Sequence, residues 1–394
     1  MMTGATLYSG GGGADIGMHD AGIDVRWGIE YDGAIAEVAR NNDLPTRTAD
    51  VTEVDPQALE SVDCLHASPP CPSFSIAKTG AKETEHDIEL ARCTATIIRA
   101  VQPRFFTLEN VWKYRQSVSW AHIRENLNGM GYEWNAWHLN AADYGVPQTR
   151  KRMIVAAVQG GPRPSRPQPT HSKPEAINTT DLFGFTPRPW VGWYESIADL
   201  VPDLETTELA PWQKKRLPDE LKETTIVNTN CSGDDGASVR CREKGAPTFT
   251  VKPPDNGRLR AVLIDGQNTN PTASGKREDR TLAMRESNAP ANTVNANQHK
   301  GVGRAVLVPG GNASSFSVRD SDEPSRTVGD TRRVGNIPRA ITTRRVLQLT
   351  PRCLARFQTF PDWYELPERK ALACRIIGNA VPPLLMQRLY ESLT

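Results

Sequence analysis

The sequence predicts an α/β fold with a doubly wound, mostly parallel sheet, into which a smaller, irregular and β-rich domain is inserted. Two observations carry this prediction. Short apolar strands alternate with helical patterns through the first 160 residues, and repeated βα units form parallel sheets. The pattern then stops at a stretch with five prolines in sixteen residues, 159–174, and helical patterns return in the last fifty residues.

The expected elements follow in chain order. A strand at 5–9 leads into a glycine run at 10–13, and the helix at 86–101 keeps a 3.6-residue apolar spacing. The other helices are expected at 14–22, 34–42, 349–360 and 380–393. The other strands are expected at 25–30, 63–67, 104–109, 133–139 and 152–158.

The composition is that of a globular protein, with 38% hydrophobic and 24% charged residues. No apolar run approaches the roughly 18 residues of a membrane-spanning helix, and the first residues lack the basic and apolar regions of a signal peptide. We therefore expect a cytoplasmic protein without a membrane segment. The seven cysteines include no C-x-x-C pair, which argues against a disulfide framework and against a structural metal site.

Positive charge is concentrated in one segment. Between Ser238 and Arg345 there are 19 Lys and Arg against 10 Asp and Glu, a net +9, although the whole chain has a net charge of +1. Most of these cations are arginines, which suit phosphate and guanine recognition. An ordinary solvated surface is the alternative interpretation.

The same basic segment contains an internal repeat. Residues 245–251, 288–294 and 322–328 share a Pro-x-x-Thr-Val core, and the first two are followed by the similar stretches 257–268 and 301–312. Their β-branched residues beside turn glycines predict β-hairpins with loops of variable length.

Cys71 lies in a stiff loop. It stands in the stretch SPPCPSFS, residues 68–75, whose prolines fix their own φ and bias the preceding residues toward extended geometry. The loop follows the expected strand 63–67, and open α/β sheets bind ligands at the carboxyl ends of their strands. Because most free cysteines act as small hydrophobic residues, this stretch alone does not identify a reactive thiol.

Two further features are typical of a nucleotide cofactor site. The glycine run at 10–13 lets the backbone approach a ligand closely, and Glu30, at the end of the second strand, can accept ribose hydroxyls. Asp50 ends a third short segment, where a contact with adenine could lie. A nicotinamide dehydrogenase would share these features, although the run is not G-x-G-x-x-G.

Charged residues mark two other strand ends. Glu109 ends the expected strand 104–109, where a buried carboxyl can act as an acid. A salt-bridged or helix-capping glutamate is the alternative. Arg150 and Arg152 stand two residues apart at the start of a strand, so they should point the same way and could clamp an anion or a carbonyl.

Six motifs occur in the order found in the DNA (cytosine-5)-methyltransferase family, which this sequence resembles. They cover roughly residues 1–158 and 340–394. The motifs are LYSGGGGADIGMHDAGI, PPCPSFS, LENV, QTRKR, RRVLQLTPRCLARFQTFPDWY and IGNAVPP.

The resemblance implies transfer of a methyl group from S-adenosyl-L-methionine to carbon 5 of a cytosine that is flipped out of DNA. Cys71 matches the nucleophile that adds to ring carbon 6. Glu109 matches the acid that protonates ring nitrogen 3. Arg152 matches the residue that holds the base carbonyl, with Arg150 supporting the same pocket.

The resemblance also implies a set of cofactor contacts. Tyr8 departs from the phenylalanine usual at its position, and Pro72 replaces a frequent glutamine. The expected contacts with S-adenosyl-L-methionine are Tyr8, Gly10, Gly12, Gly13, Glu30, Tyr31, Asp50, Val51, Pro70, Leu90, Asn379 and Val381.

The family likeness gives each part of the chain an expected role. We expect a cofactor-binding and catalytic domain at 1–160, a linker and the start of the target-recognition region at 161–237, the basic recognition domain at 238–340, and a return segment at 341–394 that completes the first domain. The expected DNA contacts are Ser75, Gln148, Arg258, Arg260, Arg332 and Arg333.

The expected partner is double-stranded DNA, with no metal, for a monomeric prokaryotic or phage enzyme that works alone or beside a restriction endonuclease. A methyltransferase of RNA cytosine is one alternative, because one branch of the family has similar motifs. A catalytically silent DNA-binding relative is another.

Overall fold

The structure is a computed structural model whose described residues fall into two compact units. The first unit comprises 1–198, 288–300 and 350–394, and the second comprises 199–287 and 301–349. The described residues are 1–70, 83–173, 186–205, 289–291 and 349–394, together with the backbone of strands at 226–228, 260–270, 281–286, 304–308, 317–319 and 345–348. The first unit thus continues past the expected boundary at residue 160.

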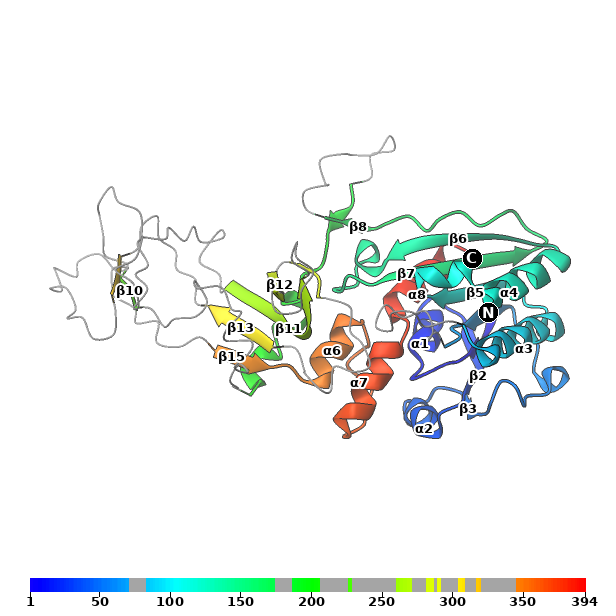
Figure 1. The fold of residues 1–394 in the computed structure, drawn as a ribbon, viewed down its shortest axis with the longest axis horizontal. Helices are drawn as coiled ribbons and strands as arrows, with labels where there is room; N and C mark the ends of the chain where they lie inside the picture. Colours follow the sequence, from blue (N-terminus) through cyan, green and yellow to red (C-terminus); the bar gives the residue numbers. More distant parts are fainter. Residues whose placement is uncertain are drawn as a thin grey trace. The chain divides into compact units, whose positions relative to one another are not determined.

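A seven-stranded sheet forms the centre of the first unit (Figure 1). Its strands lie in the order β3-β2-β1-β4-β5-β7-β6. The five strands from β3 to β5 are parallel, and β7 is antiparallel to both of its neighbours. This confirms the predicted α/β fold with a mostly parallel sheet. The strands are β1 (Thr3–Leu7), β2 (Asp24–Glu30), β3 (Thr46–Thr48), β4 (Cys64–Ala67), β5 (Phe105–Asn110), β6 (Tyr132–Asn140) and β7 (Lys151–Gln159).

Helices connect the strands and begin at identifiable caps. Thr84 and Asp87 form a capping box at the start of α3, and the Asp32 carboxylate accepts the first backbone N–H groups of α2. The helices before the return segment are α1 (Gly13–Asp20), α2 (Gly33–Asn41), α3 (Glu85–Val101) and α4 (Val118–Gly129). Short 3-10 turns are η1 (Pro56–Ala58), η2 (Trp112–Gln116), η3 (Ala141–Tyr144), η5 (Glu195–Ile197) and η6 (Val201–Asp203).

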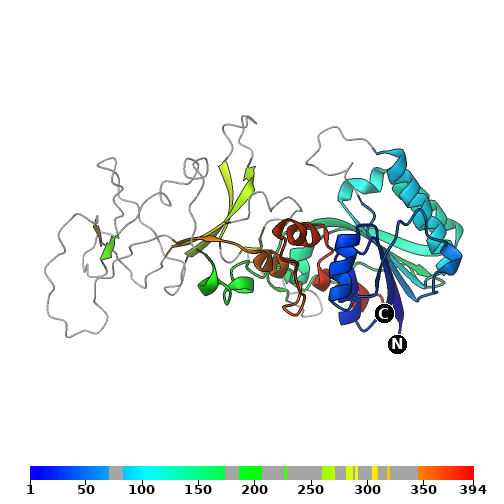
Figure 2. The same ribbon diagram turned by 90° about the horizontal axis from the view of Figure 1, so that it is seen from below.

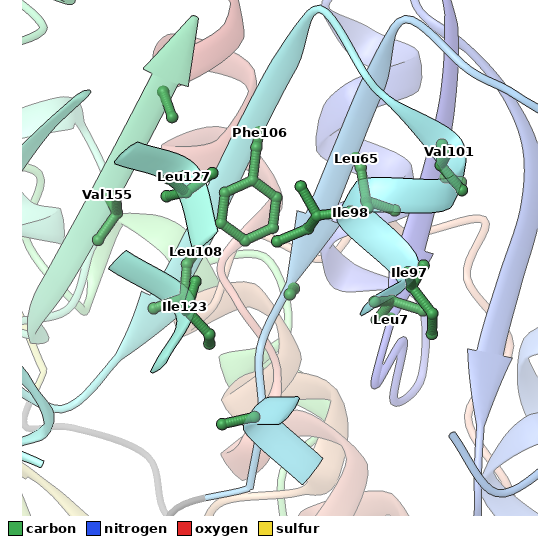
Figure 3. Packing of buried hydrophobic residues seen from close by; sticks show 14 of the residues in the cluster. Leu7, Leu65, Ile97, Ile98, Val101, Phe106, Leu108, Ile123, Leu127 and Val155 are labelled. Carbon is green, nitrogen blue, oxygen red and sulfur yellow. The ribbon is translucent and has the colours of Figure 1, made fainter. Parts of the chain in front are cut away.

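The sheet is buried on both faces. Helices α3 and α4 cover one face, and α1 with the closing helix α8 (Pro383–Glu391) covers the other (Figure 2). On the first face, Ile97 and Ile98 of α3 pack with Leu65 and Phe106 of the strands (Figure 3). Burying such side chains contributes roughly 1.5–3 kcal/mol each, which fixes the register of the strands.

The alternation of side chains along β7 shows which residues face which layer. Met153 and Val155 belong to the cluster beneath α3 and α4, whereas Ile154 and Ala156 belong to the cluster beneath α1 and α8. Even-numbered positions of β7 therefore point to the face that the return segment covers.

The return segment contains α6 (Pro351–Phe357), α7 (Lys370–Asn379) and α8. Helix α6 ends before the expected limit of residue 360, because Thr359 adopts a positive φ of 63° that a helix cannot continue. Helix α7 lacked a clear sequence signal. At Gly17 of α1 a Cβ would lie 2.3 Å from the Pro383 carbonyl oxygen, so this glycine permits the close approach of α8.

The second unit contains an antiparallel sheet in the order β12-β11-β13-β15. Strands β11 and β13 begin at Arg260 and Arg304, the equivalent positions of the first two repeats, as the repeat pattern predicts. The third repeat lies outside the described residues. The strands are β11 (Arg260–Asn270), β12 (Thr281–Glu286), β13 (Arg304–Val308) and β15 (Arg345–Gln348), with β10 (Ile226–Asn228) pairing β14 (Ser317–Arg319) and, in the first unit, β8 (His171–Ser172) pairing β9 (Arg188–Pro189).

Among the helices that the structure describes, none has the length and apolar character needed to cross a membrane.

Candidate active site

The register of four parallel strands gathers the candidate site at one edge of the sheet. Leu7 pairs with Ile29 and with Ala67, and Ala67 pairs with Leu108. The next residue of each strand or of the loop after it therefore lies at the carboxyl edge, where open α/β sheets bind ligands. These residues are Tyr8, Glu30, Ser68 and Glu109.

Glu30 is fixed by two backbone groups. Its Oε2 accepts a hydrogen bond from Gly10 N, and its Oε1 accepts one from Asp32 N, both at 2.9 Å. Burial is the largest influence on this carboxyl and raises its pKa, although the two N–H groups oppose the shift. Each oxygen keeps a second lone pair, so the carboxylate can still accept two hydroxyl groups of a ligand.

The glycine run forms a tight loop between β1 and α1. Gly10 and Gly12 have positive φ values of 57° and 85°. A Cβ at Gly10 would meet no atom within 4 Å, so this position leaves room for a ligand. A Cβ at Gly13 would lie 2.3 Å from the Val381 carbonyl oxygen, so that glycine admits the return segment.

The Tyr8 hydroxyl is held by a helix. It donates to the Leu90 carbonyl oxygen at 3.1 Å and lies 3.0 Å from Thr94 Oγ1, both in α3. Burial raises the pKa of this phenol above its usual range. The extra hydroxyl, compared with the usual phenylalanine, therefore ties the start of the glycine loop to α3.

The remaining candidate cofactor residues divide into two groups. Ala49 N donates to the Glu30 carbonyl oxygen at 3.0 Å, which brings Asp50 and the buried Val51 beside β2. The pKa of Asp50 is lowered by hydrogen bonds from the backbone and side chain of Thr52. Of the other candidates, Leu90 and Val381 are buried, whereas Tyr31, Pro70 and Asn379 are exposed.

Glu109 and Arg152 form a close ion pair. Arg152 Nε lies 2.9 Å from Glu109 Oε1, and the side chains are 17% and 9% exposed. Glu109 Oε1 accepts no hydrogen bond of good geometry among the described residues, which means that the Nε–H of Arg152 is not directed at this oxygen. Glu109 shares the parity of Thr107, which contacts Tyr390 of α8, so the pair faces the return segment.

Arg150 makes a different contact from Arg152. It is buried, and its Nη1 donates to the Gly378 carbonyl oxygen at the end of α7, at 3.2 Å. Arg150 therefore holds the return segment against the start of β7, while Arg152 contacts Glu109.

Gln148 is fully buried, although the sequence predicted a contact with DNA. Its Nε2 donates to the Phe357 carbonyl oxygen at 3.4 Å, and its backbone bridges to Ala291. Packing against these two distant segments encloses the side chain, and a contact between it and DNA stays a prediction.

The chain is anchored where it leaves β4, directly before Cys71. Ser68 Oγ donates to the Tyr8 carbonyl oxygen at 3.1 Å, and Asn110 Nδ2 donates to the Pro69 carbonyl oxygen at 3.1 Å. Cys71, Pro72 and Ser75 themselves lie outside the described residues. Arg258, Arg332 and Arg333 also lie outside them, and Arg260 is described by its backbone at the start of β11.

No group of three or more His, Cys, Asp or Glu side chains among the described residues could hold a metal ion.

A doubly wound sheet with a glycine loop, an acid on the second strand and an acid–arginine pair at the same edge is typical of enzymes that bind a nucleotide-type cofactor. Comparison with known proteins gives the family. The model of the C-5 cytosine-specific DNA methylases matches residues 2–394, so the chain belongs to this family and is a DNA cytosine-5 methyltransferase. This identification excludes the nicotinamide dehydrogenase.

Bacterial relatives agree with this assignment. The Type II methyltransferase M.XorII of Xanthomonas oryzae pv. oryzae is 26% identical over 409 residues, which cover 97% of this chain and 82% of the relative. The Type II methyltransferase M.AquIA of Picosynechococcus is 28% identical over 241 residues, which cover 55% of this chain and 96% of the relative.

Solved structures show the same fold at low identity. The Dnmt2 methyltransferase of S. pombe has a TM-score of 0.51 and 13% identity, covering 99% of this chain and 97% of that one. The methyltransferase EhMeth of Entamoeba histolytica has a TM-score of 0.53 and 13% identity, covering 100% and 98%.

The sequence did not single out the residues that support the site. Asn110 was visible in the LENV motif without a role, and it holds the Pro69 carbonyl. Tyr364 donates its hydroxyl to the Gly11 carbonyl oxygen at 2.7 Å. The available signals were a polar side chain directly after the expected strand 104–109 for Asn110, and for Tyr364 its place at the end of the motif RRVLQLTPRCLARFQTFPDWY.

Asp15 is buried beneath the glycine loop. Its Oδ1 accepts from Thr6 Oγ1 at 2.9 Å, and its Oδ2 has no hydrogen-bond partner among the described residues. Burial, the largest influence, raises the pKa of this carboxyl from 3.8 to about 6. The charged form is thus unfavourable in the folded chain.

Asp15→Asn should remove a pH dependence of stability. The pKa of Asp15 is higher in the folded chain than in the unfolded chain. At pH values between the two pKa values, the folded chain therefore binds one more proton than the unfolded chain. Stability falls as the pH rises through about 6. The asparagine variant stays neutral. From about pH 4.5 to about pH 8, its free energy of unfolding relative to wild type should rise by about 1–3 kcal/mol. Urea unfolding at several pH values measures this difference, and a constant difference would refute the assignment.

Proposed function

We propose that this chain methylates carbon 5 of cytosine in a specific sequence of double-stranded DNA, with S-adenosyl-L-methionine as methyl donor, base flipping, and a covalent adduct through Cys71. The observation that carries the proposal is the Glu109–Arg152 pair, which lies at the same sheet edge as Glu30 and as the anchored start of the Cys71 loop.

The residues present fit the proposed cofactor. Gly10 leaves open space beside the loop, and Glu30 presents a carboxylate that is already held by Gly10 N and Asp32 N. A ribose with two free hydroxyls matches the two remaining lone pairs of that carboxylate. When bound, S-adenosyl-L-methionine supplies an electrophilic methyl group. Asp50 and Val51 beside β2 would then border its adenine.

The chain's own residues would activate the base. The Cys71 thiolate adds to carbon 6 of the flipped cytosine while Glu109 protonates ring nitrogen 3. Carbon 5 then carries enamine electron density and takes the methyl group, whose bond to the sulfonium sulfur breaks and leaves a neutral thioether. Loss of the carbon 5 proton to water allows the Cys71 sulfur to leave carbon 6 as a thiolate. Ring nitrogen 3 returns its proton to the Glu109 carboxylate, which restores the neutral aromatic ring.

Arg152 and the loop anchors would set the geometry of this reaction. Arg152, 2.9 Å from Glu109, would hold the base carbonyl and keep the acid beside the ring. Asn110 and Ser68 fix the backbone directly before Pro70, which would limit the positions open to the sulfur. Arg150 would support the pocket from behind by holding the end of α7.

Sequence recognition belongs, in this proposal, to the basic segment 238–340. It contains most of the net +9 charge, and in the sequence it is separate from the motifs that form the site. Arg258, Arg260, Arg332 and Arg333 are candidates for contacts with guanine edges.

Cys71→Ser should abolish methylation. DNA incubated with the purified chain and S-adenosyl-L-methionine, then analysed by bisulfite sequencing, should show protected cytosines in one sequence context. The serine variant should show none, because its hydroxyl supplies almost no anion near neutral pH. Cys93→Ser, a partly buried cysteine of α3, is the matched control and should keep activity. Turnover by the serine variant above a few per cent of wild type would remove Cys71 from this role.

Exchanging residues 238–340 for the matching segment of a relative with another target should transfer the specificity. Direct contacts with bases determine which sequence is read, whereas the catalytic edge acts on any flipped cytosine. Bisulfite sequencing of DNA treated with the hybrid gives the methylated sites. If those sites stay the ones that the parent chain methylates, the recognition role of the segment is wrong.

A further inference from the structure

Both oxygens of Glu30 depend on backbone groups from separate parts of the chain. Gly10 N belongs to the glycine loop, and Asp32 N belongs to the turn between β2 and α2. The orientation of the carboxylate therefore depends on the position of both segments. Each of them is held by one side chain of the return segment.

Tyr364 holds the glycine loop. Its side chain is fully buried, and its hydroxyl donates to the Gly11 carbonyl oxygen at 2.7 Å. A Cβ at Gly11 would lie 2.8 Å from this hydroxyl, so the glycine is what permits the contact. Tyr364 also packs edge-on against Phe360, with ring centroids 4.9 Å apart, which restricts the phenol to one position.

Arg375 holds the turn after β2. Its Nη2 lies 2.5 Å from Asp32 Oδ2, while Asp32 Oδ1 accepts from the backbone N of Ala34 and Ile35. Burial pushes the pKa of Asp32 up, but the helix N–H groups and Arg375 outweigh it and lower the pKa. Asp32 thus connects α7 with Glu30, because its carboxylate pairs with Arg375 and its own backbone N–H binds Glu30.

We propose that Tyr364 and Arg375 are positioning residues that hold Glu30 in the geometry needed to bind the ribose of an adenosyl cofactor. The inference rests on the proposed function, because it takes Glu30 as the ribose-binding acid. The two side chains act through different segments, one through Gly11 and one through Asp32. A carboxylate that is already in place loses little freedom when the ligand binds.

The variants separate this role from helix capping. Asp32→Asn keeps a good N-cap for α2 but removes the charge that pairs with Arg375. Arg375→Gln removes the other half of the pair. Tyr364→Phe removes one hydroxyl and keeps the ring. Arg388→Gln is the matched control, since Arg388 is in a partly exposed pair with Glu391 on α8.

The experiment measures binding of S-adenosylhomocysteine by calorimetry, together with steady-state methylation kinetics. Asp32→Asn and Arg375→Gln should each raise Kd about three- to tenfold, and Tyr364→Phe about five- to tenfold. The cofactor KM should rise in parallel while kcat stays within about twofold of wild type. The Asp32→Asn/Arg375→Gln double variant should bind no worse than either single variant.

Coupling to Glu30 gives the deciding result. In a Glu30→Ala background, which should itself bind weakly, Arg375→Gln and Tyr364→Phe should add less than about twofold to Kd. Undiminished effects in that background would overturn the inference, as would single variants that bind like wild type. If wild type fails to bind S-adenosylhomocysteine, the proposed function fails and the inference fails with it.

Discussion

The parallel register of β2, β1, β4 and β5 is the constraint on which the rest of the site depends. Because Leu7 aligns with Ile29 and Ala67, the loops after these strands emerge side by side. A slip of one residue would turn each side chain to the other face. The register is fixed by burial on both faces, so the hydrophobic core determines where Glu30 and Glu109 stand relative to each other.

The return segment supplies the second constraint. Helix α8 covers the sheet face toward which Glu109 and Arg152 point. Its approach requires glycine at position 17, and the residues directly before it require glycine at position 13. The glycine-rich sequence thus serves two purposes. Gly10 leaves space for a ligand, whereas Gly13 and Gly17 admit the return segment. Residues more than 330 positions apart in the chain therefore build one site.

Local features of the sequence predicted much of this arrangement, because they depend on neighbouring residues. The strand ending at Glu30, the glycine run and the helix before residue 101 are of this kind. The burial of Gln148 depends instead on Ala291 and Phe357, which only the tertiary fold brings together. The roles of Tyr364 and Arg375 were hidden for the same reason. The repeat predicted β11 and β13, but it could not predict that β12 and β15 pair with them.

The central claim is that the acid at the end of β5 assists methyl transfer in the pocket formed with Arg152. The most direct measurement is the single-turnover rate of cytosine methylation by Glu109→Gln at saturating S-adenosyl-L-methionine and DNA. The amide keeps a hydrogen-bonding group of the same size but cannot deliver a proton, so the rate should fall roughly 10²- to 10⁴-fold while cofactor affinity is unchanged. A loss of less than about threefold would contradict the account, because ring nitrogen 3 would then be protonated by another group.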